Sequence, residues 1–439
     1  MRNTLVAAAI AAVLGTTSIA AHAATLSDIF TQGHVDGELR AYNFDRLYQT
    51  NTVPDAHALS GALLLNAKSG TFGDGFSLGA SLVTANSFGT QSTTPSKIDT
   101  TLMGPSDSVT ALSQAYAQFQ NQWVLVRGGY QYLNTPWMGG SDSRVIPASY
   151  NALMADFTPS KGWDIIALRS FGWKSRTSNS YTSDNLYYPA TYDGDSMYGG
   201  SGGLPATAPS ANGTWALGST YTAGGLKAQG WYYNYLNFAR LGYVDGSYTF
   251  KTGTGVDPFV AAQYVTETGG SNNTLVATGT KVDGVAGSNV KSRAWGADVG
   301  IAIPNGRFDV AYNKISQQAG AVGAGAIISP YTASYATDPL YTTSMIRGLV
   351  EQGPGHAWKA KAAYNFFDSK LQLVAAYAKY TTDLRGNSHD VYFDIIYNLD
   401  GYLKGLSLRN RWERSVGGTG LNPGNQSFTY NRVMIAYKF

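Results

Sequence analysis

The last segment of the chain, residues 432–439, alternates between two kinds of side chain. Successive side chains on a β-strand point to opposite faces of the sheet. A membrane barrel needs an alternating pattern in its strands, because its outer face contacts lipid and its inner face contacts water. The segment therefore predicts a transmembrane strand. Its apolar face would carry Val433, Ile435, Tyr437 and the terminal Phe439, and its other face Arg432, Met434, Ala436 and Lys438.

The N-terminus has the features of a secretory signal peptide. Arg2 supplies a positive charge, residues 5–14 form a short apolar core, and residues 21–23 read Ala-His-Ala, with small residues at the cleavage positions. We therefore expect a signal peptide over residues 1–23 and a single barrel domain over residues 24–439. Beyond the signal peptide, no run of 18 apolar residues occurs, so no transmembrane helix is expected.

The composition fits a barrel. The chain contains 51 Gly, 30 Tyr and 9 Trp but no Cys, and only 13% of its residues are charged. Glycine suits turns, and tyrosine and tryptophan suit the aromatic girdles at the two membrane interfaces. The 31 basic residues nearly balance the 28 acidic ones, which argues against a nucleic-acid surface.

Three hairpins can be read from alternation and turn chemistry. Each has two alternating segments joined by a short stretch rich in turn-forming residues. They cover residues 294–315, 358–380 and 390–413. Longer segments rich in Gly, Ser, Thr and Ala lie between other strands, at 175–212, 266–292 and 316–330.

These features predict an all-β fold, a transmembrane antiparallel β-barrel with short periplasmic turns and long extracellular loops. At 20 to 25 residues for each strand and its connection, about 16 to 18 strands fit the mature chain, and an even number is expected. Such a lumen is wide enough for water and a solute.

Three segments together resemble the OprD family of substrate-specific outer-membrane porins of Gram-negative bacteria. They are residues 37–46 (GELRAYNFDR), residues 141–147 (SDSRVIP), and the run from 394–397 (DIIY) through 406–411 (LSLRNR). The resemblance implies an 18-stranded barrel that is narrowed by inward-folded loops. It also implies a ladder of basic residues that guides small carboxylate-bearing nutrients. The positions that match this ladder and the constricting third loop are Arg40, Arg127, Arg144, Arg409 and Arg411.

The ladder also has a physical basis. A carboxylate that enters a narrow pore loses hydration, and guanidinium groups can replace it with bidentate, charge-assisted hydrogen bonds. Arg409 and Arg411 would lie on one face, about 6.5 to 7 Å apart, so a solute could pass between weak sites. We expect Glu413 and Asp394 to pair with these arginines in the empty pore. Any one of the arginines could instead brace the wall, and Lys359 and Lys361 are expected to be solvated wall charges.

The sequence predicts a passive porin, not an enzyme, that needs no cofactor or metal. Its partners would be small solutes, outer-membrane lipid and the barrel-assembly machinery, and it would be a monomer or a homotrimer. A general diffusion porin or an oligosaccharide channel, for example for chito-oligosaccharides, would equally explain the aromatic residues. A barrel hydrolase is a third alternative. Its support is the presence of a triad's residue types at Ser388, His389 and Asp390. This support is weak, because adjacent side chains on a strand face opposite sides and cannot form a triad together.

Phe439 provides a test of barrel assembly, because a terminal aromatic residue resembles the assembly signal of bacterial outer-membrane barrels. Deleting Phe439 removes one apolar side chain, so the stability of the folded barrel should barely change. Delivery to the outer membrane should fall, as cell fractionation would show. An unchanged outer-membrane yield would mean that the segment is only another strand.

Overall fold

The computed structural model describes residues 31–183, 204–205, 207–270, 272–328, 330–331, 338–420 and 423–439. The signal peptide expected over residues 1–23 lies outside these residues. Within them, none of the helices has the length and apolar character needed to span a bilayer.

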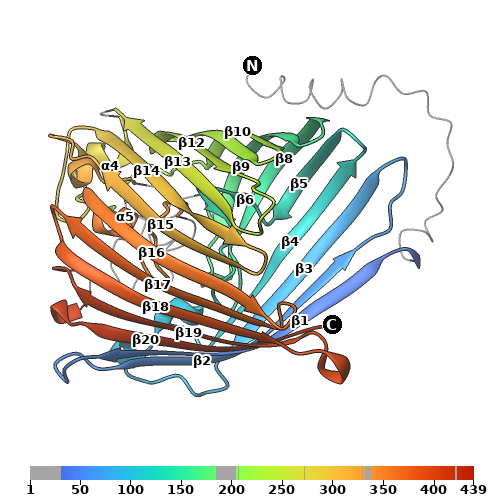
Figure 1. Cartoon of the computed structure of the whole chain (residues 1–439), viewed down its shortest axis with the longest axis horizontal. Helices are drawn as coiled ribbons and strands as arrows, with labels where there is room; N and C mark the ends of the chain where they lie inside the picture. The colour runs from blue at the N-terminus through green and yellow to red at the C-terminus, as the bar shows by residue number, and fades with distance from the viewer. Residues whose placement is uncertain are drawn as a thin grey trace.

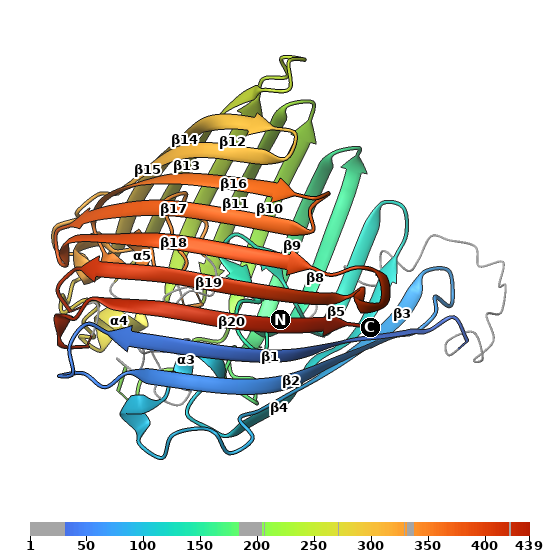
Figure 2. The same ribbon diagram turned by 60° about the horizontal axis from the view of Figure 1, so that its bottom comes forward.

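Eighteen antiparallel strands form a single sheet that closes on itself (Figure 1). The first and last strands complete the ring, and Figure 2 shows blue β1 beside red β20. This confirms the predicted barrel and its strand number. The barrel strands are β1 (His34–Tyr48), β2 (Ala56–Lys68), β3 (Phe76–Asn86), β4 (Ser108–Gln120), β5 (Val124–Gln131), β8 (Ser149–Ser160), β9 (Trp163–Lys174), β10 (Thr214–Ala223), β11 (Leu226–Tyr235), β12 (Ala239–Thr249), β13 (Asp257–Gly269), β14 (Val290–Ile303), β15 (Gly306–Ile315), β16 (Gly355–Phe366), β17 (Leu371–Thr382), β18 (Gly386–Asn398), β19 (Leu406–Gly417) and β20 (Phe428–Lys438).

The elements outside the wall are short. They are β6 (Asn134–Thr135), β7 (Met138–Gly139), α3 (Thr100–Met103), α4 (Thr274–Ala277), α5 (Leu349–Gln352), and the single 3₁₀ turns η1 (Pro95–Lys97), η2 (Val322–Gly325), η3 (Gly401–Leu403) and η4 (Pro423–Asn425).

The connections differ in length between the two ends of the barrel. Short turns such as residues 224–225 and 304–305 lie at one end of the barrel, which we call the turn end. β1 begins and β20 ends at this same end. The longer connections lie at the other, the loop end. Two of them matter below, L3 (residues 132–148) and L7 (residues 316–354). L7 is longer than the 316–330 segment read from the sequence, because it continues through α5.

The solvent exposure of the side chains of β20 follows the alternation predicted for this strand. On β20, Val433 and Ile435 are 42% and 41% exposed on the outer face, whereas Arg432 is 1% exposed inside. The three predicted hairpins are also present, as β14–β15, β16–β17 and β18–β19. On β20, apolar side chains therefore face outward and Arg432 faces inward, as a lipid-embedded strand requires.

Side chains from L3 and L7 pack inside the barrel. Val145 of L3 and Met345 of L7 join wall residues such as Phe44 in one buried cluster. Trp137 of L3 and Leu349 of L7 belong to a second cluster. The lumen is therefore filled in part by loops.

Close packing at the inner wall requires glycine at position 218. Gly218 of β10 pairs directly with Trp231 of β11. A β-carbon at Gly218 would lie 2.3 Å from the indole of Trp231, which is far inside van der Waals contact. The Trp231 ring thus lies flat over the glycine backbone.

We expect Gly218→Ala to lower the free energy of unfolding by about 1 to 3 kcal/mol, because the indole must move. Gly230→Ala is the matched control, since a β-carbon there would meet its nearest atom at 3.8 Å. Urea unfolding of both variants in detergent would measure the difference. Equal stabilities would contradict the packing described for Gly218.

Candidate functional site

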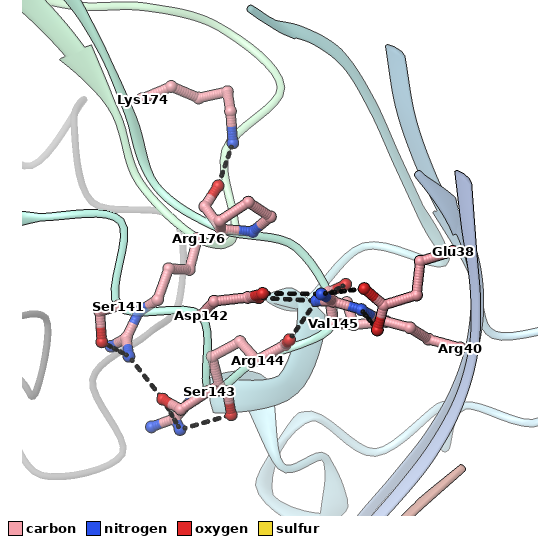
Figure 3. A network of polar contacts seen from close by, with 10 residues as sticks. Glu38, Arg40, Ser141, Asp142, Ser143, Arg144, Val145, Lys174 and Arg176 are labelled. Atoms are coloured by element: carbon pink, nitrogen blue, oxygen red, sulfur yellow. Dashed lines mark hydrogen bonds and ion pairs between the residues drawn. The ribbon is translucent and has the colours of Figure 1, made fainter. Parts of the chain in front are cut away.

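Arg40 of β1 holds L3 against the inner wall (Figure 3). Its two terminal nitrogens donate to the two carboxylate oxygens of Asp142 in L3, each at 2.7 Å. Nη1 also donates to the backbone oxygens of Arg144 and Val145, and Nε donates to Glu38 at 2.9 Å. The Arg40 side chain is 3% exposed, while that of Asp142 is 51% exposed. At this point the lumen therefore contacts Asp142, with Arg40 behind it.

The opposite side of L3 contacts the end of β9. Arg176, just after β9, donates to the hydroxyl groups of Ser141 and Ser143, at 3.3 and 3.4 Å. Lys174 donates to the backbone oxygen of Pro147 at 3.1 Å (Figure 3). Arg144 lies in L3 as predicted and is buried, with its guanidinium 5.9 Å from the ring centre of Phe44. L3 is thus fixed between β1 and β9.

L7 is fixed by charged side chains of β18 and β19. Arg347 donates to Asp390 at 3.2 Å and also to Ser415. Glu413 accepts from the backbone nitrogen of Met345 at 2.9 Å and from the hydroxyl of Ser344 at 2.5 Å. Glu413 therefore holds L7, and the expectation that it pairs with the pore arginines is wrong.

Lys359 also differs from its prediction. It is buried, and its ammonium donates to the backbone oxygen of Thr343 in L7 at 2.8 Å. It is therefore a contact to the loop and not a solvated wall charge. The sequence did not predict the contact between Lys359 and Thr343, because the loop predicted at residues 316–330 ends before Thr343.

Two carboxyl groups, those of Asp338 and Glu351, are half-buried within L7 itself. Burial, together with the nearby Asp338, raises the pKa of Glu351 to about 8, although the backbone nitrogen of Gly348 donates to it at 2.7 Å. Burial likewise raises the pKa of Asp338 to about 6, and this carboxyl accepts from Thr343 at 2.7 Å. Near neutral pH the ionised form of Glu351 is therefore disfavoured, which lets it fit the packed interior.

Arg409 and Arg411 face the lumen from β19, as the alternation predicted. Arg409 makes a bidentate contact with Asp394 on neighbouring β18, with Nε at 2.8 Å and Nη2 at 2.5 Å. Nε of Arg411 lies 3.4 Å from the same carboxylate. The predicted pairing with Asp394 is present. Arg409 is 30% exposed and Arg411 12% exposed, so Arg409 is the more accessible of the two.

Arg127 lies on another part of the wall, on β5, with β20, β1, β2, β3 and β4 between it and β19. Its guanidinium donates twice to the side-chain oxygen of Gln118 on β4, and it lies 4.3 Å from the ring centre of Tyr116. It is half-buried. The structure therefore does not bring Arg127 together with the β19 pair.

A second accessible basic group was not singled out as a site from the sequence. Arg307 of β15 is 45% exposed and contacts Asp298 at 2.7 Å and Asp309 at 3.0 Å. Lys361 of β16 is 32% exposed and lies 3.6 Å from Asp309. Alternation within residues 306–315 puts Arg307 on the same face as Asp309, which is the signal that identifies it, but the three segments that resemble the OprD family lie elsewhere in the chain.

Aromatic side chains also line the inner wall, on β11. Trp231, Tyr233 and Tyr235 stack in sequence, with ring centres 5.8 Å apart at each step. All three are buried, and Tyr233 is fully covered. Trp137 of L3 and Tyr331 and Leu349 of L7 belong to the same cluster. These rings therefore support the loops and are closed to a solute.

The structure also separates the residues of the weak hydrolase motif. Ser388 and Asp390 are buried on the inner face. His389 stacks on Tyr377 of the outer face, with ring centres 5.8 Å apart. Alternation therefore keeps the imidazole away from the other two side chains. In the part of the chain that the structure describes, no group of three acidic or histidine side chains could hold a metal ion.

We expect Arg40→Met to release L3, because each charge-assisted bond that is lost contributes about 1.5 to 3 kcal/mol. Single-channel recordings should show larger and noisier currents, and L3 should become sensitive to proteases. Arg169→Met, an arginine of β9 whose guanidinium lies against Phe171 and Trp215, is the control and should behave as wild type. If the current amplitude and noise of Arg40→Met equal those of the wild type, contacts other than those of Arg40 hold L3.

Comparisons with known proteins address the fold. No family profile matches the sequence, and no curated protein matches it. OccK9 (OpdG) of Pseudomonas aeruginosa superposes with a TM-score of 0.75 at 15% identity, covering 94% of this chain and 99% of that chain. OccAB2 of Acinetobacter baumannii gives 0.71 at 16% identity, with the same coverage. OpdK of P. aeruginosa, in a structure with vanillate, gives 0.69 at 13% identity, covering 93% and 99%.

These identities are low, so the likeness concerns the fold. The closed wall of 18 strands with an apolar exterior is that of a Gram-negative outer-membrane barrel. The chain therefore has the fold of the OprD and Occ outer-membrane porins, which confirms the resemblance identified in its sequence.

Proposed function

We propose that the protein is a passive, substrate-selective porin for small carboxylate-bearing solutes. The observation that carries this proposal is the position of Arg409. Its guanidinium faces the lumen and is held in place by Asp394, and among the described residues its Nη1 group has no hydrogen-bond partner. A solute carboxylate could therefore bind Nη1 without breaking an existing contact.

The accessibility of the arginine and aromatic side chains in the lumen favours acids over sugars as substrates. A sugar channel needs exposed aromatic rings along its path, on which sugar rings can stack. The stacked rings of β11 are buried beneath the loops, whereas Arg409 and Arg307 are partly exposed. The stacked rings of β11 therefore offer no open surface to a sugar, which supports the carboxylate alternative.

The arginines have different roles in this proposal. Arg409 contacts the solute first, while Arg411 behind it raises the local positive potential and shares Asp394. Arg127, Arg307 and Lys361 offer further weak sites around the wall. Several weak sites allow a solute to move on, whereas one deep site would trap it.

Arg40 and Arg144 act indirectly in this account. Arg40 is fully engaged by Glu38 and L3, and Arg144 is buried in L3, so both determine where the loop lies and how wide the passage is. The vanillate in the OpdK structure is itself a carboxylate, which agrees with the proposed substrate class.

The Arg409→Ala, Arg411→Ala double variant tests the proposal. It removes two lumen cations and leaves Asp394 without its arginine partners, so the pore should shift towards cations. Carboxylate uptake should fall by tenfold or more, taking about 1.5 to 3 kcal/mol for each charge-assisted bond. Reversal potentials under a salt gradient and radiolabelled uptake would measure both effects.

The control is Arg169→Ala on β9, which removes an arginine that does not line the proposed path. Heat-modifiability on gels would confirm that each variant folds. Wild-type selectivity and wild-type carboxylate uptake in the double variant would identify both arginines as wall braces and remove the main support for acid transport.

A further inference from the structure

Basic side chains gather on the outer face of the barrel, near the loop end of strands β12 to β19. They lie close to the loop-end termini of their strands and alternate with buried neighbours that face the lumen, so they project outward. We call this set the basic belt. It consists of Arg240, Lys291, Arg293, Lys314, Lys379 and Arg414.

Within the strands that the structure describes, β12 to β19, no acidic side chain lies on the same outer face as the basic belt. The acidic residues of the loop-end and central parts of these strands, such as Asp298, Asp390 and Glu413, are buried and face inward. In the described part of β12 to β19, therefore, the outer face carries positive charge without a matching negative charge. An unbalanced charge in a lipid-facing wall indicates an anionic partner at the membrane surface.

Aromatic rings lie directly beneath the basic belt on the same outer face. Trp295 contacts Tyr312 and Trp358 contacts Tyr377, with ring centres 5.3 and 5.2 Å apart. Such a girdle marks the boundary between the hydrocarbon core and the headgroups. The basic belt lies just beyond it, at headgroup depth, and long extracellular loops place this end of the barrel in the outer leaflet.

Two hollows on this surface complete the arrangement. Arg240 and Lys291 both line a pocket of about 590 Å³ at the loop end, together with the side chains of several asparagines. Thr268 pairs with both residues, so their backbones are two strand spacings, about 9.6 Å, apart. A second hollow of about 590 Å³ lies lower on the wall, where Ala360, Ala362 and Ala375 are flanked by Val310 and Phe393.

We propose that this face binds a phosphorylated glycolipid of the outer leaflet. Its phosphate groups would contact the basic belt around Arg240, Lys291 and Arg293, and one acyl chain would lie in the alanine-lined groove. The two cations of the pocket suit a headgroup with two phosphates, because guanidinium and ammonium groups both form charge-assisted bonds with phosphate. The proposal concerns the outer wall and is independent of the solute in the lumen.

The Arg240→Gln, Lys291→Gln, Arg293→Gln variant tests the phosphate site. Binding of diphosphoryl lipid A to the refolded protein in detergent, followed by native mass spectrometry, should weaken by tenfold or more, since each lost charge-assisted bond is worth about tenfold. Monophosphoryl lipid A should bind the wild type more weakly than the diphosphoryl form. Added salt should weaken both.

The matched control is Lys161→Gln, Lys227→Gln, Lys404→Gln, which removes the same charge from exposed lysines near the turn end. It should bind diphosphoryl lipid A as wild type does. Equal binding by the belt variant and the wild type would overturn the proposal. An equal loss of diphosphoryl lipid A binding in the belt variant and in the control would also overturn the proposal, because binding would then depend only on the net charge of the protein. If the triple variant does not fold, the single variants Arg240→Gln and Lys291→Gln carry the same test.

The Ala360→Leu, Ala375→Leu variant tests the acyl groove separately. It fills the hollow and leaves every basic residue in place. We expect weaker binding of diphosphoryl lipid A with an unchanged preference over the monophosphoryl form. Undiminished binding would exclude the groove as the place of the acyl chain.

Discussion

The pairing of β1 with β20 closes the barrel. In a bilayer, every backbone hydrogen-bonding group must find a partner within the protein, and a sheet can achieve this only by closing. The register runs from Glu38 opposite Lys438 to Tyr48 opposite Phe428, and Phe439 continues it through two backbone hydrogen bonds to Gly37. Closure fixes which face of each strand contacts lipid and which faces the lumen, where Arg40, Arg409 and Arg411 lie.

Closure also creates an interior that is too wide to pack with wall side chains alone. L3 and L7 fill part of it, and ionic contacts hold both loops. Arg40 binds L3, while Glu413 and Asp390 bind L7. Charged residues of the lumen thus divide into two groups. Those covered by loops set the shape of the passage, and those left partly exposed, such as Arg409 and Arg307, are available to a solute.

The sequence predicted the wall well because the alternation that marks a barrel strand lies within the residues of that strand. Alternation placed Arg409, Arg411 and Arg432 inside and predicted the β14–β15 hairpin with its turn, without knowledge of any distant residue. The extent of L7 was missed because residues 331–354 contain no alternation, and their turn signals, Asp338-Pro339 and Gly353-Pro354, do not show how far the loop runs.

The division of the lumen charges could not be predicted in the same way. Arg40 and Arg409 look alike in sequence, since each follows a leucine in a segment whose alternation predicts a barrel strand. They differ because Asp142, 102 residues away, covers Arg40, whose side chain is 3% exposed, whereas that of Arg409 is 30% exposed. Glu413 likewise has its partners 68 and 69 residues away in L7. Such contacts depend on where the loops fold, which local patterns do not specify.

If accessible arginines, and not aromatic rings, select the solute as proposed, transport should depend on the charge of the solute. The most direct test is the flux of three solutes of similar size and different charge, glucuronate, glucose and glucosamine, through the wild-type protein in proteoliposomes. We expect glucuronate to cross fastest and glucosamine slowest, with smaller differences in flux at high salt, because salt screens the charges. Glucose flux equal to or greater than glucuronate flux would contradict it.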